Sequence, residues 1–280
     1  MSIVAVTSAK GSPGVTTAAL ALAWVWPQVA PGRRALVVDA DMAGGDIAAG
    51  FLRGEVSASD GLLAVAADRG DDPASGLWQH LVAVDTEGTR LVLTGITDPA
   101  QARGLVPAWP GLADLFADLD DADPPVDVII DMGRLGGSLD PGEVRARADL
   151  VLLVTRSSLV SVAHARSAAP QLRCDHPTTT AGPAGLGLLV VRERHPYSAR
   201  EVSAAVGLPL LGCLAWDPGV AAVFTDGAPV TRRLPRSALV RSTLPVAEAV
   251  LCQLIDSSRG VARSAGDESA AAVNGQVRHA

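Results

Sequence analysis

Short apolar runs recur along this chain, and stretches long enough for helices separate them. The runs occupy residues 2–7, 35–39, 90–94, 126–131, 150–155, 187–191 and 208–214. Strands that are buried on both faces have continuous apolar sequences, and strands that alternate with helices are typical of parallel sheets. The sequence therefore predicts an α/β fold with a doubly wound, mostly parallel sheet and helices on both faces.

The stretches between the runs predict the helices. They lie at residues 15–27, where Pro27 is expected to end the helix, and at 111–119, 158–172 and 198–206. A last helix is predicted over residues 237–256, with an interruption at Pro245. Residues 257–280 are small and polar without apolar periodicity, so we expect one domain over residues 1–256 and a flexible tail after it.

Composition excludes several classes of protein. With 48% hydrophobic and 19% charged residues, the chain is not mainly disordered. No apolar run reaches about 18 residues, and no basic leader precedes an apolar stretch, so we expect neither a membrane-spanning helix nor a secretory signal. The three cysteines form no closely spaced pair, which argues against a zinc or iron–sulfur site and against a disulfide scaffold. We therefore expect a cytoplasmic protein, and its net charge of −7 argues against nucleic-acid binding over the whole surface.

Ligands of doubly wound sheets bind beyond the carboxyl ends of the strands, and the loop after the first strand is the most informative of these places. Residues 10–17 read KGSPGVTT and lead from the strand into a helix, so backbone N–H groups would face an anion there. The general phosphate-loop pattern GxxxxGK[ST] fails twice, at Ala9 and Val15. Lys10 is the only lysine among 23 basic residues, which predicts a specific role for it; the alternative is a solvated surface lysine.

Four segments in order resemble the ParA/MinD family of ATPases. Residues 10–17 resemble its deviant Walker A motif, KGGxGKTT, at six of eight positions when the variable one is counted. Residues 39–46, DADMAGGD, resemble its acidic motif DxDxxGGD, and residues 126–131 resemble a Walker B strand. Residues 198–229 resemble its late helix–strand–helix, which includes a GLPLLG strand. The resemblance covers about residues 1–250; the alternative is an unrelated α/β domain whose glycine-rich turn is only a turn.

The resemblance implies ATP and Mg²⁺ as cofactors and assigns roles to residues. Lys10 would reach the phosphates of a partner subunit, and Asp41 would orient the attacking water. Mg²⁺ would be held by Thr16, Asp39 and Asp131, although a helix cap and loop-capping aspartates are the alternatives for these three. The nucleotide would lie along Lys10, Gly11, Ser12, Pro13, Gly14, Val15, Thr16 and Thr17, with Arg192, Trp216 and Asp217 at its base.

Several residues depart from the family pattern. Val15 stands where the family has its second lysine, and a valine cannot donate to the β- and γ-phosphates. Pro13 removes one backbone N–H, and Ser12 replaces a glycine. The asparagine that often precedes Arg192 in the family is absent, and Trp216 either stacks on a base or fills a pocket at the rim. We therefore predict weak ATP binding with slow hydrolysis, or a pseudo-ATPase that keeps the fold as a scaffold.

The resemblance also implies a function and partners. We expect a nucleotide-dependent homodimer that positions cellular cargo, such as a chromosome or plasmid partition complex, a division-site factor, or a pilus or secretion apparatus. A non-enzymatic adaptor of the same fold is the alternative. The C-terminal tail lacks large apolar residues, so we expect no membrane-docking helix there. Nonspecific DNA contact is a further prediction, with a solvated face as its alternative, for four arginines: Arg232, Arg233, Arg236 and Arg241.

Overall fold

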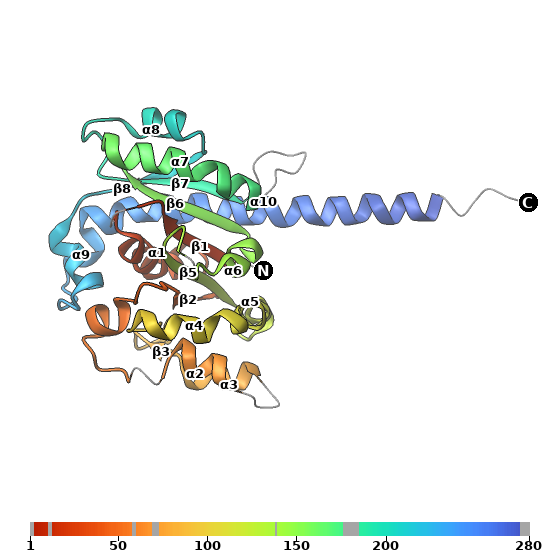
Figure 1. Cartoon of the computed structure of the whole chain (residues 1–280), viewed down its shortest axis with the longest axis horizontal. Coiled ribbons are helices and arrows are strands. Elements are labelled where there is room, and N and C mark those ends of the chain that lie inside the picture. Colours follow the sequence, from red (N-terminus) through yellow and green to blue (C-terminus); the bar gives the residue numbers. More distant parts are fainter. Residues whose placement is uncertain are drawn as a thin grey trace, which may run out of the picture.

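The computed structural model describes residues 3–10, 13–57, 60–68, 73–137, 139–175 and 185–274. Within them lies an eight-stranded sheet with the order β3-β4-β2-β5-β1-β6-β7-β8, parallel except for β3, which pairs antiparallel with β4 (Figure 1). The predicted fold class is confirmed. The strands are β1 Ile3–Ser8, β2 Arg34–Asp39, β3 Val82–Ala83, β4 Arg90–Leu93, β5 Val126–Arg134, β6 Leu150–Arg156, β7 Leu186–Val191 and β8 Leu210–Leu214.

Helices occupy both faces of the sheet. The α-helices are α1 Val15–Val29, α2 Leu62–Ala67, α3 Pro73–Gln79, α4 Ala102–Leu105, α5 Trp109–Asp118, α6 Gly142–Arg147, α7 Leu159–Asp175, α8 Ala199–Val206, α9 Pro218–Thr225 and α10 Ala238–Asn274. A π-helical turn, η1, spans Ile47–Phe51, and short 3₁₀ turns lie at Pro99–Gln101, Val106–Ala108, Leu119–Asp121 and Leu234–Arg236.

Alternate residues of each strand face opposite halves of the core. In β1, Ile3 and Ala5 pack with the core on one face, and Val4 and Val6 pack with the core on the other. Helices α2 to α8 contribute to the first half, and α1, α9 and α10 contribute to the second. The continuous apolar runs in the sequence reflect this burial on both faces.

Two helices continue past prolines that were predicted to end or interrupt them. Helix α1 continues to Val29 with Pro27 in its last turn, where a single backbone hydrogen bond is lost. Helix α10, which packs against α1 and β8, continues through Pro245 because residues on both sides of the proline are buried in the core, Leu239 and Val240 before it and Val246 and Ala247 after it. It also passes the predicted end at Asp256 and reaches Asn274, through a stretch rich in alanine and free of proline. The domain boundary at residue 256 stays a prediction.

Part of α10, Ala238–Asp256, is long and apolar enough to cross a membrane by length and mean hydropathy, which is 1.4. Counting uninterrupted apolar runs did not predict this, because Arg241 and Glu248 divide the segment. Val246, Ala247 and Val250 are buried in the core beside α1, so packing in the domain accounts for part of the apolar composition.

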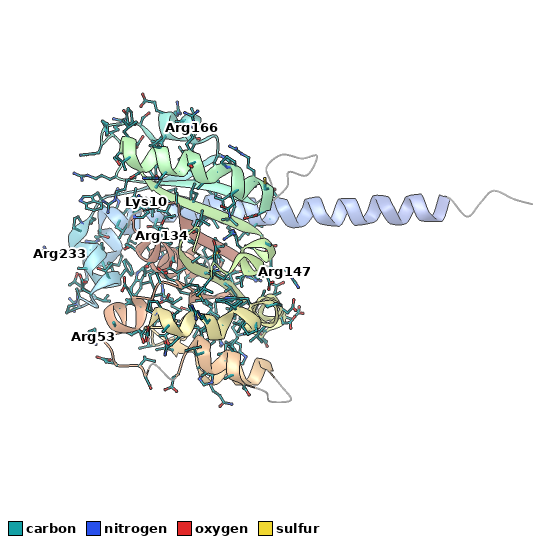
Figure 2. All side chains as sticks on the ribbon, viewed as in Figure 1. Lys10, Arg53, Arg134, Arg147, Arg166 and Arg233 are labelled. Atoms are coloured by element: carbon teal, nitrogen blue, oxygen red, sulfur yellow. The ribbon has the colours of Figure 1, made fainter. Side chains whose placement is uncertain are left out.

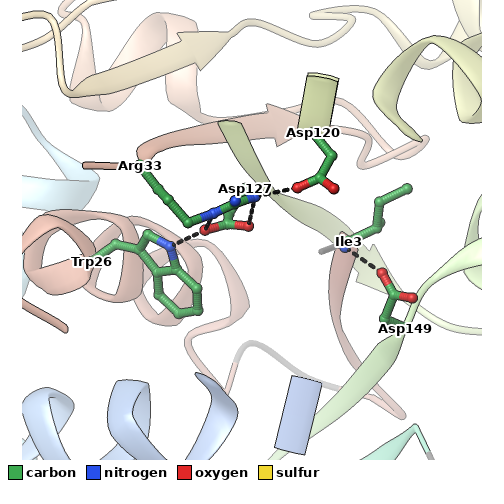
Figure 3. A network of polar contacts seen from close by, with 6 residues as sticks. All are labelled: Ile3, Trp26, Arg33, Asp120, Asp127 and Asp149. Carbon is green, nitrogen blue, oxygen red and sulfur yellow. Dashed lines mark hydrogen bonds and ion pairs between the residues drawn. The ribbon is translucent and has the colours of Figure 1, made fainter. Parts of the chain in front are cut away.

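A polar network joins α1, the residue before β2, the 3₁₀ turn at Leu119–Asp121 and β5 at the end of the sheet opposite the ligand edge (Figure 3). Asp127 is 1% exposed and accepts hydrogen bonds from Trp26 Nε1 at 2.8 Å and from Arg33 Nε at 2.7 Å. The Arg33 guanidinium also reaches Asp120, at 2.5 Å. Removing the Asp127 carboxylate would leave the indole N–H and part of a guanidinium without their buried partner.

Candidate functional site

A cavity of about 930 Å³ opens beyond the carboxyl ends of the parallel strands. The start of α1, the segment after β2, the ends of β5 and β6, and the β8–α9 connection enclose it. Its wall includes Gly14, Val15, Thr16, Thr17, Asp41, Asp46, Arg134, Arg156, Trp216, Asp217 and Asp226. This is the edge at which the sequence places the phosphate loop, the acidic motif and the base-binding segment.

The start of α1 has the form of an anion site. Gly14 precedes the helix with φ +103°, in the left-handed region that favours glycine. No side chain among the described residues caps the helix, and the first backbone hydrogen bond of α1 runs from Ala18 N–H to the Gly14 carbonyl. The N–H groups of Val15, Thr16 and Thr17 precede that bond, and all three residues line the cavity.

Two buried aspartates lie beside the loop. Asp39 and Asp131 end the apolar parts of β2 and β5 and are direct register partners, and each is 1% exposed. Asp39 accepts hydrogen bonds from the Asp41 and Ile47 N–H groups. Asp131 Oδ1 accepts one from Gly133 N–H at 3.0 Å, whereas its Oδ2 is buried with no hydrogen-bond partner among the described residues. A carboxylate oxygen in that position fits a cation.

The protonation of these carboxylates reflects their burial. Burial raises the pKa of Asp131 to about 6, an effect that the neighbouring Thr16 side chain partly opposes. Burial and the charge of Asp131 also raise the pKa of Asp39 well above its usual value. A bound cation would favour the ionised form of both carboxyl groups, because its charge offsets the cost of burying theirs.

Asp41 lies at the rim of the cavity, in the turn after β2. Its Oδ1 accepts a hydrogen bond from Ala43 N–H at 2.8 Å. Gly133, on β5, has φ +56°, and a Cβ atom there would collide with the Asp41 carboxylate. Glycine at this position therefore allows the carboxylate to pack against the backbone that follows Asp131.

Val15 faces both the cavity and the core. It is 7% exposed and packs within the apolar cluster between α1 and the sheet. The position that carries an ammonium in the motif it resembles is therefore an apolar contact here.

Lys10 and Arg192, the two basic residues that the sequence assigns to the nucleotide, lie outside the described cavity wall. Lys10 is exposed and does not belong to the described lining of the cavity. Figure 2 shows it with Arg134 toward the side where the strands end, away from Arg147. Its predicted contact with a partner subunit is not tested by a single chain. Gly11 and Ser12, also predicted to bind nucleotide, lie outside the described residues.

At the opposite end of the cavity, Trp216 contacts two arginines. The Arg156 and Arg192 guanidinium carbons lie 5.0 and 5.2 Å from the centroid of the Trp216 ring system. Asp217, predicted to bind nucleotide, caps α9 by accepting from Val220 N–H at 3.3 Å while it also lines the cavity. Arg192 does not belong to the described lining; its guanidinium lies against Trp216, and its N–H donates to the carbonyl of the lining residue Leu214.

The cavity therefore brings together most of the predicted residues and adds others. Pro13, Gly14, Val15, Thr16 and Thr17 line it beside Asp41, and Asp39 and Asp131 lie in the strands behind it. Sequence analysis assigned no role to four charged lining residues, which are Asp46, Arg134, Arg156 and Asp226. Arg134 and Arg156 could have been predicted from their positions in the sequence, since each is the last residue of a strand that ends at the ligand edge.

The four arginines with a predicted DNA contact are all exposed, and within the described part of the chain they form no ion pair. Arg233 and Arg236 also border a separate cavity of about 650 Å³ on the far side of α9. Exposure is consistent with the predicted DNA contact and equally with a solvated face, so the DNA contact stays a prediction.

No family model and no curated protein matches the sequence. Solved structures match it along most of its length. The septum site-determining protein MinD of Pyrococcus horikoshii, complexed with Mg-ADP, matches with a TM-score of 0.66 and 18% identity over 89% of this chain and 95% of that one. A ParA family ATPase of Chlorobium tepidum matches with a TM-score of 0.66 and 20% identity over 88% and 97%.

The MinC:MinD cell division complex of Aquifex aeolicus matches with a TM-score of 0.67 and 15% identity over 90% of this chain and 96% of that one. The chain therefore has the fold of the MinD and ParA ATPases, as the ordered motifs predicted. At these identities the similarity shows the fold, and the chemistry rests on the site residues.

Proposed function

We propose that this chain binds ATP with Mg²⁺ in the cavity at the start of α1. One observation carries the proposal: within the described residues, Asp131 Oδ2 is buried with no close hydrogen-bond partner, and the Thr16 side chain and the uncapped N–H groups at the start of α1 lie beside it. An acidic oxygen that needs a cation and N–H groups that need an anion lie at one edge of the sheet. A metal-bound phosphate chain meets both needs.

Within this proposal, Thr16, Asp39 and Asp131 hold the Mg²⁺, directly or through water. The ion, when bound, would neutralise charge on the phosphate oxygens. Asp41, at the rim, is the residue available to orient an attacking water. Lys10 is exposed and is assigned to the phosphates of a partner subunit.

The alternative is a pseudo-ATPase that acts as an adaptor, and the burial of Val15 favours it. An ammonium that bridges the β- and γ-phosphates stabilises the charge that develops during transfer, and loss of one such contact costs about 3 kcal/mol or more. We therefore expect hydrolysis to be slow even when ATP is bound.

We further propose that the bound nucleotide controls dimerisation, and that the dimer positions cargo in the cytoplasm. The solved structures of similar fold include a septum site-determining protein and a ParA family ATPase, which supports cargo of the partition or division type. A pilus or secretion apparatus is an alternative cargo. The four exposed arginines before and within α10 add nonspecific DNA as a proposed partner, and binding that weakens steeply with salt would support it.

Sedimentation and phosphate release, measured on the same protein, test the switch and separate it from the adaptor. With Mg²⁺ and ATP we expect a shift from monomer to dimer and slow release of phosphate. A dimer without any phosphate release would favour the adaptor. A monomer under all nucleotide conditions would contradict the switch.

Asp131→Asn is the matched variant for this experiment. It keeps the side-chain shape and removes a buried charge, so the metal-free fold should stay intact while the effect of Mg²⁺ is lost. If Asp131→Asn responds to Mg²⁺ and ATP as the wild type does, the metal lies elsewhere.

A further inference from the structure

We propose that Arg134 and Arg156 supply the positive charge that the phosphates would otherwise receive from a lysine at position 15. This inference rests on the proposed function and identifies the residues on which nucleotide affinity depends. Arginine is suited to the role because its planar guanidinium donates two parallel hydrogen bonds to phosphate oxygens.

Cations in the cavity wall are few. Among the described residues that line it, Arg134 and Arg156 are the basic ones, and Asp41, Asp46, Asp217 and Asp226 are the acidic ones. With Val15 at the start of α1, a polyanionic ligand would otherwise meet an excess of negative charge. One divalent cation and the two guanidiniums together offset the charge of these four carboxylates.

Strand register places the two arginines on either side of the phosphate loop. The loop follows Ser8, the last residue of β1, and β1 lies between β5 and β6 in the sheet. Arg134 is the register partner of Ser8 on β5. On β6 the partner of Ser8 is Val154, so Arg156 lies two residues further toward the cavity. Neighbouring strands are about 4.8 Å apart, so both arginines start one strand away from the loop.

Their surroundings give the two arginines different positions along the ligand. Arg134 follows Asp131 by three residues on β5, on the side of the proposed metal. Phosphates that share the metal are the β- and γ-phosphates, so Arg134 is placed to sense the terminal one. Arg156 is half-buried, and its guanidinium lies against Trp216, toward β8 and away from the metal. It is therefore placed near the phosphates closer to the sugar.

The other basic residues near this edge fit the role less well. Lys10 and Arg192 do not belong to the described cavity wall, and the Arg192 guanidinium lies against the Trp216 ring. The role therefore falls to the two arginines that line the cavity.

Calorimetric titration of ATP and of ADP, each with Mg²⁺ and at one salt concentration, tests the inference. We expect Arg134→Gln to weaken ATP binding about tenfold or more while changing ADP binding little, because a hydrogen bond to a charged group is lost. We expect Arg156→Gln to weaken both nucleotides to a similar degree. Arg166→Gln, an exposed substitution on α7, is the matched control and should bind like the wild type.

Arg134→Lys and Arg156→Lys guard against a purely structural effect, since each keeps the charge and should restore part of the lost affinity. If the wild type binds nucleotide and both glutamine variants bind it equally well, this inference is wrong and the proposed function stands. If the wild type binds neither nucleotide, both are wrong.

Discussion

Replacing Val15 with lysine tests whether the start of α1 is a phosphate site. The side chain is 7% exposed, and it packs in the core while facing the cavity. Full burial of a valine contributes about 1.5–3 kcal/mol, and the lysine stem would recover part of that by lying along the same apolar surface. We therefore expect Val15→Lys to lower the free energy of unfolding of the nucleotide-free protein by about 1–2 kcal/mol.

Nucleotide binding should change in the opposite direction. An ammonium at this position would donate to phosphate oxygens, and hydrogen bonds of that kind contribute about 1.5–3 kcal/mol. That range corresponds to an increase in ATP affinity of about ten- to a hundredfold. The variant should thus be less stable without ATP and bind ATP more tightly.

Val15→Met is the control, because it has a comparable chain length without the charge. Urea unfolding without nucleotide measures the packing cost, and calorimetry with ATP and Mg²⁺ measures the gain. If Val15→Lys is folded and binds ATP no better than Val15→Met, no phosphate lies over the start of α1, and the assignment of the cavity is refuted.

Three further predictions follow from the same structure. Lys10→Ala should weaken nucleotide-driven dimerisation while it changes the unfolding free energy by less than about 0.5 kcal/mol, since the residue is exposed; equal dimerisation of both proteins in sedimentation would contradict the partner role. Asp127→Ala should lower the unfolding free energy by about 3–5 kcal/mol by breaking a buried ion pair, and unchanged urea unfolding would refute that estimate of its contribution. The folded protein favours the protonated form of Asp131, whose pKa is raised to about 6. The contribution of this residue to folding stability is therefore present at low pH and is lost as the pH rises through that value. From about pH 7.5 to about pH 5.5 we therefore expect the metal-free protein to gain stability and to lose affinity for Mg²⁺ with ATP, and flat profiles in both assays would contradict this.

The central part of the sheet was predictable from the sequence because its strands are buried on both faces. An apolar run such as residues 150–155 is a direct consequence of that burial, and β6 is found at Leu150–Arg156. The edge strand β3 was missed, since Val82–Ala83 is two residues long and has no run to detect. Proline was a misleading signal for the end of a helix at Pro27 and Pro245. Packing of α1 and α10 against the sheet outweighs the one backbone hydrogen bond that each proline removes.

The positions of several candidate residues were predictable because they depend on order along the chain. The loop before α1, Asp41 and the aspartates that end two strands lie at the edge of the sheet where the motifs placed them, and their roles stay predictions. Side-chain environment was not predictable: the sequence does not reveal that Val15 is buried, or that Arg156 lies against Trp216. These contacts join residues far apart in the chain, and only the folded sheet brings them together.

The most direct measurement for the central claim is a calorimetric titration of the wild-type protein with ATP, with Mg²⁺ and again with excess chelator. The account predicts saturable binding of one nucleotide per chain that weakens strongly when the metal is removed, because Asp131 Oδ2 has no other buried partner in the described structure. Absence of binding up to millimolar ATP, or binding that is indifferent to Mg²⁺, would contradict it.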